Sequence, residues 1–297
     1  FNKYGLLSSL IDALKILYLT RNQKFDLIHV SVEPFSFIAY LLSFFLRIPY
    51  TISVAGTYGV VLPKNHWFFK LSFNKSNRII ALSNYTKNKI LKITPKAKIT
   101  VINPGVDKSI FYPNHSAKKN QIIFVGNFKE RKGFDVLLKS LVELKKTFND
   151  FNLLIITSDD LKYHPNFLNE LNLKKIKYEV KTNVNNETLR SHYNESKVNV
   201  LISQEVKNNF EGFGLIHYES IACGTLTIGA LDSGNEDAIK TPNGYLIRCK
   251  DYKELSAILF NILNTKNYPI LNIKDVKEWK ETGFEYLKLF KSIINQI

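Results

Sequence analysis

Two glutamates, Glu211 and Glu219, are separated by seven residues and enclose a Gly-Phe-Gly turn. The turn follows a predicted strand at 198–203 and opens a predicted helix. Glycines at 212 and 214 let the backbone approach a ligand closely, and the free amides at a helix N-terminus favour a phosphate. The segment therefore offers the groups that a ligand bearing both phosphates and hydroxyls requires.

The spacing of the two carboxylates suits an elongated ligand. Glu219 lies about two turns into the predicted helix, roughly 12 Å of rise if the segment is regular. A nucleoside diphosphate linked to a sugar has a comparable reach, so one carboxylate would bind sugar hydroxyls and the other ribose hydroxyls. The competing interpretation is structural: Glu211 caps the helix N-terminus and Glu219 pairs with a lysine. The glycine turn favours ligand binding.

The elements around this segment follow the pattern of βαβ units, in which apolar runs of strand length alternate with longer periodic stretches. Strands are predicted at 25–30, 49–54, 78–83, 99–102, 121–126, 153–157, 177–180, 198–203, 225–230 and 244–247, and helices at 35–48, 84–92, 134–147, 187–196, 215–222, 253–263 and 278–294. The predicted fold class is α/β, with two Rossmann-like parallel-sheet domains in tandem. Ligands of such folds bind beyond the carboxyl ends of the strands, so the cleft between the domains is the expected site.

A polar run at 113–120 is the best candidate for a linker between the domains. The N-terminal domain is accordingly predicted at 1–115 and the C-terminal domain at 116–275. The last segment, 276–297, forms a helix that is expected to pack back on the N-terminal domain. The length of 297 residues supports this division, because it exceeds what a single core usually holds.

The chain is basic, with 41 Lys and Arg against 26 Asp and Glu and a net charge of +15. Such a charge attracts polyanions, including phosphorylated substrates and anionic membrane surfaces. No basic patch interleaved with aromatic residues is present in the sequence, so nucleic acid is not an expected partner.

Cysteine content and hydropathy indicate the compartment. Two cysteines, Cys223 and Cys249, are too few for a disulfide framework and predict a reducing, cytoplasmic location. The most apolar stretch, 35–48, is shorter than the roughly 20 residues that span a bilayer, which favours a buried helix. The sequence contains no methionine and begins at Phe1 within a predicted helix, so we expect the natural N-terminus to lie upstream.

The segment containing the two glutamates resembles the E-x7-E signature of glycosyltransferase family 4, which has the GT-B fold. Glu211 and Glu219 stand at its spacing, and Glu-Gly-Phe-Gly-Leu at 211–215 matches its start. Further matches follow in the order of the family: Ser-Asn-Tyr-Thr-Lys at 83–87, Asn-Pro-Gly-Val-Asp at 103–107, Phe-Val-Gly-Asn-Phe-Lys-Glu-Arg-Lys-Gly at 124–133, Ala-Cys-Gly-Thr-Leu-Thr-Ile-Gly at 222–229, Asp-Ser-Gly-Asn-Glu-Asp-Ala-Ile at 232–239 and Asn-Gly-Tyr-Leu at 243–246. Each match is weak by itself, but together they identify a member of this family.

The resemblance implies an enzyme that transfers a hexose from a nucleotide-sugar donor, with retention of anomeric configuration. Lys132 would neutralise the donor diphosphate as charge develops on the leaving group. Glu211 would hold the donor sugar and Glu219 the ribose. Glu211 and Lys132 are the predicted catalytic residues, and the predicted donor-binding residues are Asn127, Lys132, Glu211, Gly212, Phe213, Gly214, Leu215 and Glu219.

Cofactors and partners follow from the same resemblance. Members of the family typically need no metal, and Asp159 and Asp160 are adjacent rather than spaced as Asp-x-Asp, so no cofactor is expected. The acceptor would be a glycan or a lipid-linked molecule bound on the N-terminal domain, in the synthesis of a cell-surface polysaccharide or glycolipid. The basic charge is compatible with a cytoplasmic protein that is peripheral on the inner face of the membrane.

Several positions depart from the family pattern. The opening strand and its glycine-rich loop are absent before Phe1, which would leave an open sheet edge. Ala55 stands where the family commonly has a histidine near the reacting sugar. Asn127 replaces the usual arginine of the phosphate loop, a loss for which Lys129 or Arg131 would compensate. Thr-Ser-Asp at 157–159 occupies a turn where glycine is usual.

These departures keep a second hypothesis open. A degenerate GT-B protein that binds a nucleotide or a protein partner without catalysis would also combine an intact donor half with an altered acceptor half. Two histidines are candidate substitutes for the missing one: His29, at the end of a predicted strand, and His217, which is better explained as a packing residue. Epimerase chemistry on the nucleotide sugar is a weaker alternative.

Overall fold

The computed structural model describes residues 5–114, 116–160 and 164–296, and the chain forms two compact units. The first unit comprises Phe1–Asn103 and Lys280–Ile297, and the second comprises Pro104–Trp279. Each unit is built on a parallel sheet, which confirms the predicted fold class. The sequence placed the first boundary at the polar run 113–120, whereas the structure places it at residues 103–104.

Three contacts explain why the segment from 104 to 114 belongs to the second unit. The backbone N–H of Val106 donates to the carbonyl of Lys277 at 2.9 Å. The ring of Phe111 lies against that of Tyr193 with 6.2 Å between centroids. The side-chain amide of Asn194 donates to the carbonyl of Tyr112 at 3.0 Å. The polar composition of 113–120 predicts a turn, but these earlier residues are already attached to the second unit.

The first unit contains a four-stranded sheet in the order β1-β2-β3-β4, with every neighbouring pair parallel. The strands are β1 (Ile28–Val30), β2 (Tyr50–Val54), β3 (Arg78–Ala81) and β4 (Ile99–Val101). Within the described residues β1 pairs with β2 alone, so its other edge carries no strand.

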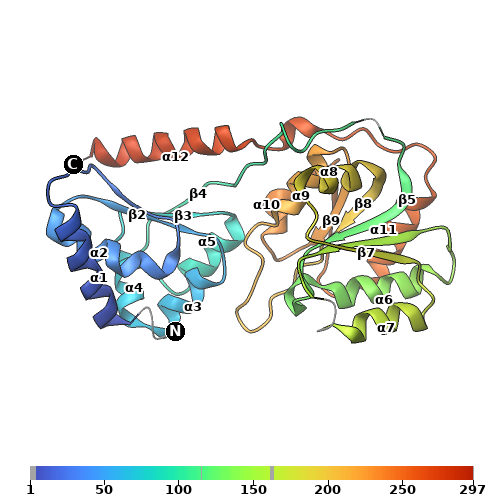
Figure 1. Ribbon diagram of the computed structural model, residues 1–297, viewed down its shortest axis with the longest axis horizontal. Coiled ribbons are helices and arrows are strands. Elements are labelled where there is room, and N and C mark those ends of the chain that lie inside the picture. The colour runs from blue at the N-terminus through green and yellow to red at the C-terminus, as the bar shows by residue number, and fades with distance from the viewer. Residues whose placement is uncertain (1–4, 115, 161–163, 297) are drawn as a thin grey trace. The chain divides into compact units, whose positions relative to one another are not determined.

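Helices cover both faces of this sheet. In Figure 1, α12 (Trp279–Ile294) runs along one face, and α1 (Leu6–Leu19), α2 (Ser36–Leu46) and α4 (Trp67–Lys75) lie on the other. The hydroxyl of Tyr286 on α12 is 2.9 Å from that of Ser53 on β2. The last helix of the chain therefore completes the first unit. No helix in the described part of the chain combines the length and the apolarity needed to cross a membrane.

Three helices with more than one turn escaped sequence analysis: α3 (Tyr58–Asn65), α4 and α7 (Pro165–Leu173). Pro63 lies inside α3, and α3 and α4 meet at His66. The apolar residues at 58–75 are therefore divided between two short helices, so they show no single long helical repeat in the sequence. The remaining helix of the first unit, α5 (Asn84–Leu91), was predicted from its serine cap; the Ser83 hydroxyl accepts from the N–H of Thr86 at 3.1 Å.

The second unit contains a six-stranded parallel sheet in the order β10-β9-β8-β5-β6-β7. Its strands are β5 (Lys119–Val125), β6 (Asn152–Thr157), β7 (Tyr178–Thr182), β8 (Ser196–Val200), β9 (Leu226–Ala230) and β10 (Gly244–Ile247). The chain starts at β5, adds β6 and β7 on one side, and then returns to add β8, β9 and β10 on the other. The strand order therefore reverses between β5 and β8, where the loops leaving the two strands diverge.

Helices pack on both faces of this sheet. They are α6 (Phe134–Leu144), α7, α8 (Asn186–Glu195), α9 (Leu215–Ala222), α10 (Asn235–Ala238) and α11 (Tyr252–Asn264). Figure 1 shows α6 and α7 on one side of the sheet and α8 and α9 on the other. Leu141 on α6 and Leu259 on α11 are both fully buried in one core cluster with Ile122 on β5 and Val200 on β8. This core fixes the strand ends from which the loops of the candidate site depart.

Candidate functional site

The loops that follow β5 and β8 meet at the point where the strand order reverses. A short 3-10 helix, η3 (Glu130–Lys132), follows β5, and the segment that leads to Glu211 follows β8. Gln204 joins the two loops, because its backbone N–H donates to the carbonyl of Arg131 at 2.9 Å and its side chain to that of Glu130 at 2.8 Å. The topology therefore makes neighbours of residues that are 80 positions apart.

Glu211 is bound by two cations. Its Oε2 lies 2.5 Å from Nζ of Lys132 and 2.7 Å from Nη1 of Arg131. The three side chains are only 14–23% exposed. The other carboxylate oxygen, Oε1, makes no hydrogen bond within the described residues. Glu211 thus pairs with cations rather than capping a helix, and one of its oxygens remains available.

The charge states of this cluster follow from its surroundings. Burial alone would raise the pKa of Glu211, but the charges of Lys132 and Arg131 outweigh burial and lower the pKa below its ordinary value. Glu211 is therefore ionised at neutral pH, and the cluster of two cations and one anion carries a net positive charge. The second cation, Arg131, was considered in the sequence only as a replacement for an arginine at 127.

A cavity of about 440 Å³ lies beside the two cations. Its walls come from the loop after β5, the ends of β6 and β7, and the start of α8, and include Asn127, Arg131, Lys132, Thr157, Asn183 and Leu189. The volume falls in the range of small-molecule sites. The Oδ1 atom of Asn127 is buried and has no hydrogen-bond partner among the described residues. Of the predicted donor residues, Asn127 and Lys132 line this cavity and Glu211 contacts it through Lys132.

The glycine turn after Glu211 has the conformation that the sequence predicts. Gly214 is the N-cap of α9 and has φ of 88°, in the left-handed region. A side chain there would press against His217 and Asn235. Asn235 fixes the turn from the other side, since its amide nitrogen donates to the carbonyl of Phe213 at 3.3 Å. No side chain caps α9, so Gly212, Phe213, Gly214 and Leu215 present backbone at this helix start, outside the cavity lining described above.

Glu219 lies on α9 and faces α8. Its Oε2 accepts a hydrogen bond from the hydroxyl of Tyr193 at 3.1 Å. Among the described residues it has no cationic partner, so the alternative in which Glu219 pairs with a lysine is wrong. Burial raises the pKa of Glu219, and the bond from Tyr193 opposes that rise in part. No local motif in the sequence pointed to Tyr193.

Both histidines considered as catalytic substitutes are engaged in structural contacts. His217 is fully buried, its Nδ1 lies 2.6 Å from the hydroxyl of Thr227, and burial lowers its pKa to about 3. The ring nitrogens of His29 lie 2.8 Å from the Thr51 hydroxyl and 3.2 Å from the Ser53 hydroxyl. Its ring also packs against α12. His29 belongs to the middle of β1 rather than to the end of a strand.

The segment around Ala55 has a carboxylate that sequence analysis missed. The backbone N–H of Ala55 donates to Oε1 of Glu33 at 2.9 Å. Glu33 is buried in a short 3-10 helix, η2 (Glu33–Phe35), and burial raises its pKa. A buried carboxyl with a raised pKa therefore lies against the backbone of Ala55.

Gly133 fixes the position of Lys132, which leads to a first prediction. Gly133 has φ of 66°, and a Cβ at this position would collide with the carbonyl oxygen of Ile202. We expect Gly133→Ala to lower the free energy of unfolding by about 2–4 kcal/mol, because both the backbone conformation and the collision oppose a side chain. A thermal melt measures the loss as a fall in Tm of several degrees.

The matched control is Gly283→Ala. Gly283 lies within α12, and a Cβ there meets nothing within 4 Å. Alanine is the better helix former by up to about 1 kcal/mol, so this variant should melt at the same temperature or slightly higher. Equal melting temperatures for the two variants would contradict the role given to Gly133.

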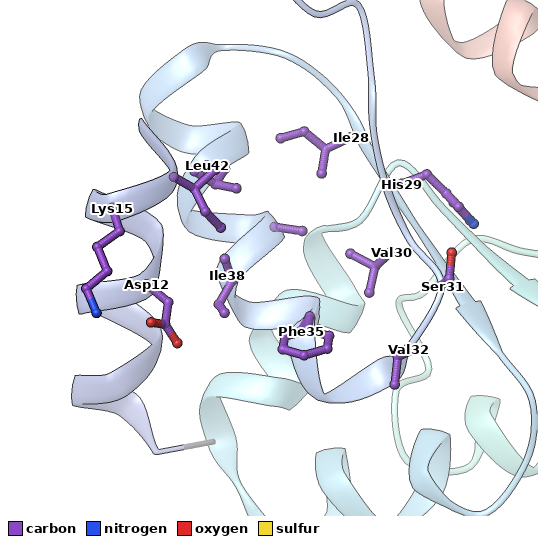
Figure 2. A pocket seen from close by; sticks show the side chains of 12 residues that line it. Asp12, Lys15, Ile28, His29, Val30, Ser31, Val32, Phe35, Ile38 and Leu42 are labelled. Atoms are coloured by element: carbon purple, nitrogen blue, oxygen red, sulfur yellow. The ribbon is translucent and has the colours of Figure 1, made fainter. Parts of the chain in front are cut away.

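A second cavity, of about 530 Å³, lies in the first unit between α1, β1 and α2. Figure 2 shows Val30 and Ile38 pointing into it, while His29 points to the other side of β1. The lining is largely apolar, with Asp12 and Lys15 on α1 as its charged members. None of the predicted catalytic or donor-binding residues lines this cavity, although the candidate substitute His29 does.

The described residues contain no group of three or more His, Cys, Asp or Glu side chains placed to hold a metal ion. Asp159 has a structural contact instead, because its Oδ2 accepts from the backbone N–H of Phe128 at 2.7 Å. This bond holds the loop after β5 against the loop after β6.

Comparison with known proteins identifies the family of this chain. The family model described as Glycosyl transferases group 1 matches residues 106–283, and the model described as Glycosyltransferase Family 4 matches residues 1–110. An uncharacterized glycosyltransferase of Methanocaldococcus jannaschii is 28% identical over 295 residues, covering 97% of this chain and 78% of that protein.

Solved structures show the same fold. A sucrose-phosphate synthase from Thermosynechococcus elongatus superposes with a TM-score of 0.80 at 16% identity, covering 99% of this chain and 80% of that one. The Anabaena protein HepE, in complex with UDP and glucose, superposes with a TM-score of 0.70 at 14% identity, covering 99% of this chain and 82% of that one. The two parallel-sheet units are therefore those of the GT-B fold.

Proposed function

Because this chain belongs to the glycosyl transferases group 1 family, we propose that it transfers a hexose from a nucleotide-sugar donor to a glycan or lipid-linked acceptor. The observation that carries the proposal is the convergence of Lys132 and Arg131 on Glu211, beside the cavity where the strand order reverses. Two fixed cations suit a diphosphate, and a carboxylate with one oxygen available suits sugar hydroxyls. The UDP and glucose bound to HepE support a donor of this class.

Each proposed site residue has one role in the reaction. The bond between the sugar C1 and the β-phosphate oxygen breaks, and a bond from C1 to an acceptor hydroxyl oxygen forms. Lys132 neutralises the charge that develops on the departing diphosphate, and Glu211 holds hydroxyls of the sugar. The acceptor proton passes to the departing phosphate or to solvent. Retention of configuration and independence from metal ions are part of the proposal.

The donor site extends from the cations toward α9. The diphosphate would meet the backbone amides of 213–215, at the start of α9, where the helix N-terminus favours negative charge. Glu219, whose carboxylate has Tyr193 as its partner, would accept hydrogen bonds from the ribose hydroxyls. Asn127 would contact the phosphates from the other wall of the cavity.

The basic charge of +15 supports a setting for the reaction. An anionic membrane surface would concentrate a protein of this charge and would present a lipid-linked acceptor to it. A cytoplasmic enzyme that is peripheral on the membrane and builds a cell-surface polysaccharide or glycolipid fits these conditions.

One observation favours the second candidate, a protein that binds nucleotide without transferring sugar. Position 55 offers no imidazole, and both ring nitrogens of His29 are already engaged. Nucleotide binding without release of nucleotide from any donor, in the presence of mixed acceptors, would assign this function instead.

The decisive experiment is nucleotide binding, measured by thermal shift and then by titration with UDP, GDP, ADP and their common sugar conjugates. We expect saturable stabilisation by one nucleotide, lost in Lys132→Ala and Glu219→Ala. At a ligand concentration 100 times Kd, the free energy of unfolding of the wild type should rise by about 2.7 kcal/mol. A folded sample that responds to none of these ligands would contradict the proposal.

A further inference from the structure

Tyr193 is a fully buried tyrosine on α8 that no motif identifies. Its ring packs edge-on against Phe111, with centroids 6.2 Å apart. Its backbone carbonyl accepts hydrogen bonds from the hydroxyl of Thr225 and, at 3.4 Å, from Nζ of Lys118. Ring and backbone are therefore both fixed, and the hydroxyl can point in only one direction.

That direction is toward Glu219, 26 residues further along the chain. The hydroxyl donates to Oε2 at 3.1 Å. Burial, together with the charge of Glu219, raises the pKa of Tyr193 well above its ordinary value, so the hydroxyl keeps its proton and acts as a donor. The second carboxylate oxygen makes no hydrogen bond within the described residues. One oxygen is thus held and the other is left for a ligand.

The position of Tyr193 on α8 connects this contact with the cavity. Leu189, which lines the cavity, precedes Tyr193 by four residues, so both side chains lie on the same face of α8 with about 6 Å of rise between them. Glu219 does not line the cavity itself, so a ligand that fills the cavity would have to extend past Leu189 toward α9 to reach it.

We propose that Tyr193 is a positioning residue that orients the Glu219 carboxylate toward the ribose hydroxyls, so that the pair selects ribonucleotides over nucleotides that lack these hydroxyls. The inference rests on the proposed donor-binding function. It adds that Glu219 alone is insufficient: without the bond from Tyr193 its carboxylate is free to rotate and lies ionised in a buried place with no partner, a state that burial disfavours.

The test uses pairs of ligands that differ only in the ribose. UDP, GDP and ADP are titrated alongside their 2′,3′-dideoxy counterparts, into the wild type and the Tyr193→Phe variant. For the nucleotide that binds the wild type, we expect Tyr193→Phe to weaken affinity about 10-fold. Affinity for the dideoxy counterpart should change less than 2-fold, because that ligand never used the carboxylate.

The pH profile gives a second readout that a purely structural role would not move. The bond from Tyr193 lowers the pKa of Glu219, so its removal raises that pKa further. Nucleotide binding needs the ionised Glu219 carboxylate. As the pH is lowered, nucleotide affinity should therefore begin to fall at a higher pH in Tyr193→Phe than in the wild type. Cys223 interacts electrostatically with both members of this pair, and Lys118 and Arg190 interact with Cys223. Burial lowers the pKa of Lys118 to about 8. The affinities of the wild type and Tyr193→Phe are therefore compared below pH 7, where Lys118 stays protonated.

Tyr50→Phe is the matched control, because it also removes a buried tyrosine hydroxyl. That hydroxyl donates to the carbonyl of Ser72 at 2.5 Å, in the first unit. The Tyr50→Phe variant should have a lower Tm than the wild type, with unchanged affinity for the nucleotide and for its dideoxy counterpart. If Tyr193→Phe does not fold, Glu219→Asp tests the same contact, since the shorter side chain keeps its charge but loses the reach to Tyr193.

The outcomes separate the two proposals. If Tyr193→Phe weakens the binding of the nucleotide and of its dideoxy counterpart equally, the role of Tyr193 is overturned while the donor-binding function stands. Unchanged affinity for the nucleotide in Tyr193→Phe would have the same meaning. Failure of the wild type to bind any of the six ligands would overturn the donor-binding function itself.

Discussion

Replacing Lys132 with methionine is expected to reduce the release of nucleotide from the donor sugar by about 1,000-fold. Lys132 lies 2.5 Å from Glu211 and lines the cavity in which we place the diphosphate. As the bond to the sugar breaks, negative charge grows on the phosphate, and an ammonium fixed in a mostly buried site stabilises that charge more than it stabilises the intact donor. Methionine keeps the length and the apolar stem of lysine, so the loss would report the charge.

The measurement is release of the nucleoside diphosphate from whichever sugar conjugate stabilises the wild type, with rates extrapolated to saturating donor. Lys129→Met is the matched control. The sequence offered Lys129 as a substitute for the phosphate-loop arginine, but Lys129 is exposed and does not line the cavity. It lies three residues before Lys132 in the same loop, and its backbone carbonyl accepts from the N–H of Lys132 at 2.8 Å, a bond that the substitution leaves in place. It should retain wild-type rates, and a comparable loss in both variants would contradict the role of Lys132.

Glu211→Gln is the second large effect, with an expected loss of about 100–1,000-fold in the same reaction. The amide is a weaker acceptor for sugar hydroxyls than the carboxylate. The same substitution should leave binding of the free nucleoside diphosphate intact or tighten it, because Lys132 and Arg131 lose an internal anion that competes with the phosphates. Weaker binding of free nucleotide would contradict this account of the cluster.

The stability of Glu211→Gln should depend on pH in a definite direction. The pKa of Glu211 is lowered in the folded protein, so its ion pairs stabilise the fold above the ordinary glutamate pKa and cease to do so as the pH falls through the lowered value. The variant should therefore melt below the wild type at pH 7, and the difference should shrink toward low pH. Thermal melts between pH 7 and pH 3 measure the difference in Tm between the wild type and Glu211→Gln.

Much of the fold could be predicted from the sequence because parallel strands are buried on both faces and appear as continuous apolar runs. The bounds of α9 and β10 coincide with the prediction, since a glycine turn marks the start of each. The glycine turn also led to Glu211 and Glu219, and the family resemblance led to Lys132. The roles of these residues stay predictions.

The contacts that hold the site together could not be predicted in the same way. Arg131 reaches Glu211 because the strand order reverses between β5 and β8, which no local window of sequence contains. Tyr193 occupies an ordinary position on a polar helix, and only the packing of α8 against α9 brings its hydroxyl to Glu219. The unit boundary at residue 103 depends on long-range contacts as well, whereas the composition of the chain changes ten residues later.

The path of the chain through its two units has a consequence for the order of folding. Residues 104–279 are continuous, so the second unit can fold as soon as they have been synthesised. The first unit needs α12, which is made after all of them, to cover the sheet face that contains His29 and Ser53. During synthesis, which proceeds from the N-terminus, that face stays exposed to water and to chaperones. The first unit therefore cannot complete its native contacts until α12 has been made, although its strands precede those of the second unit in the sequence.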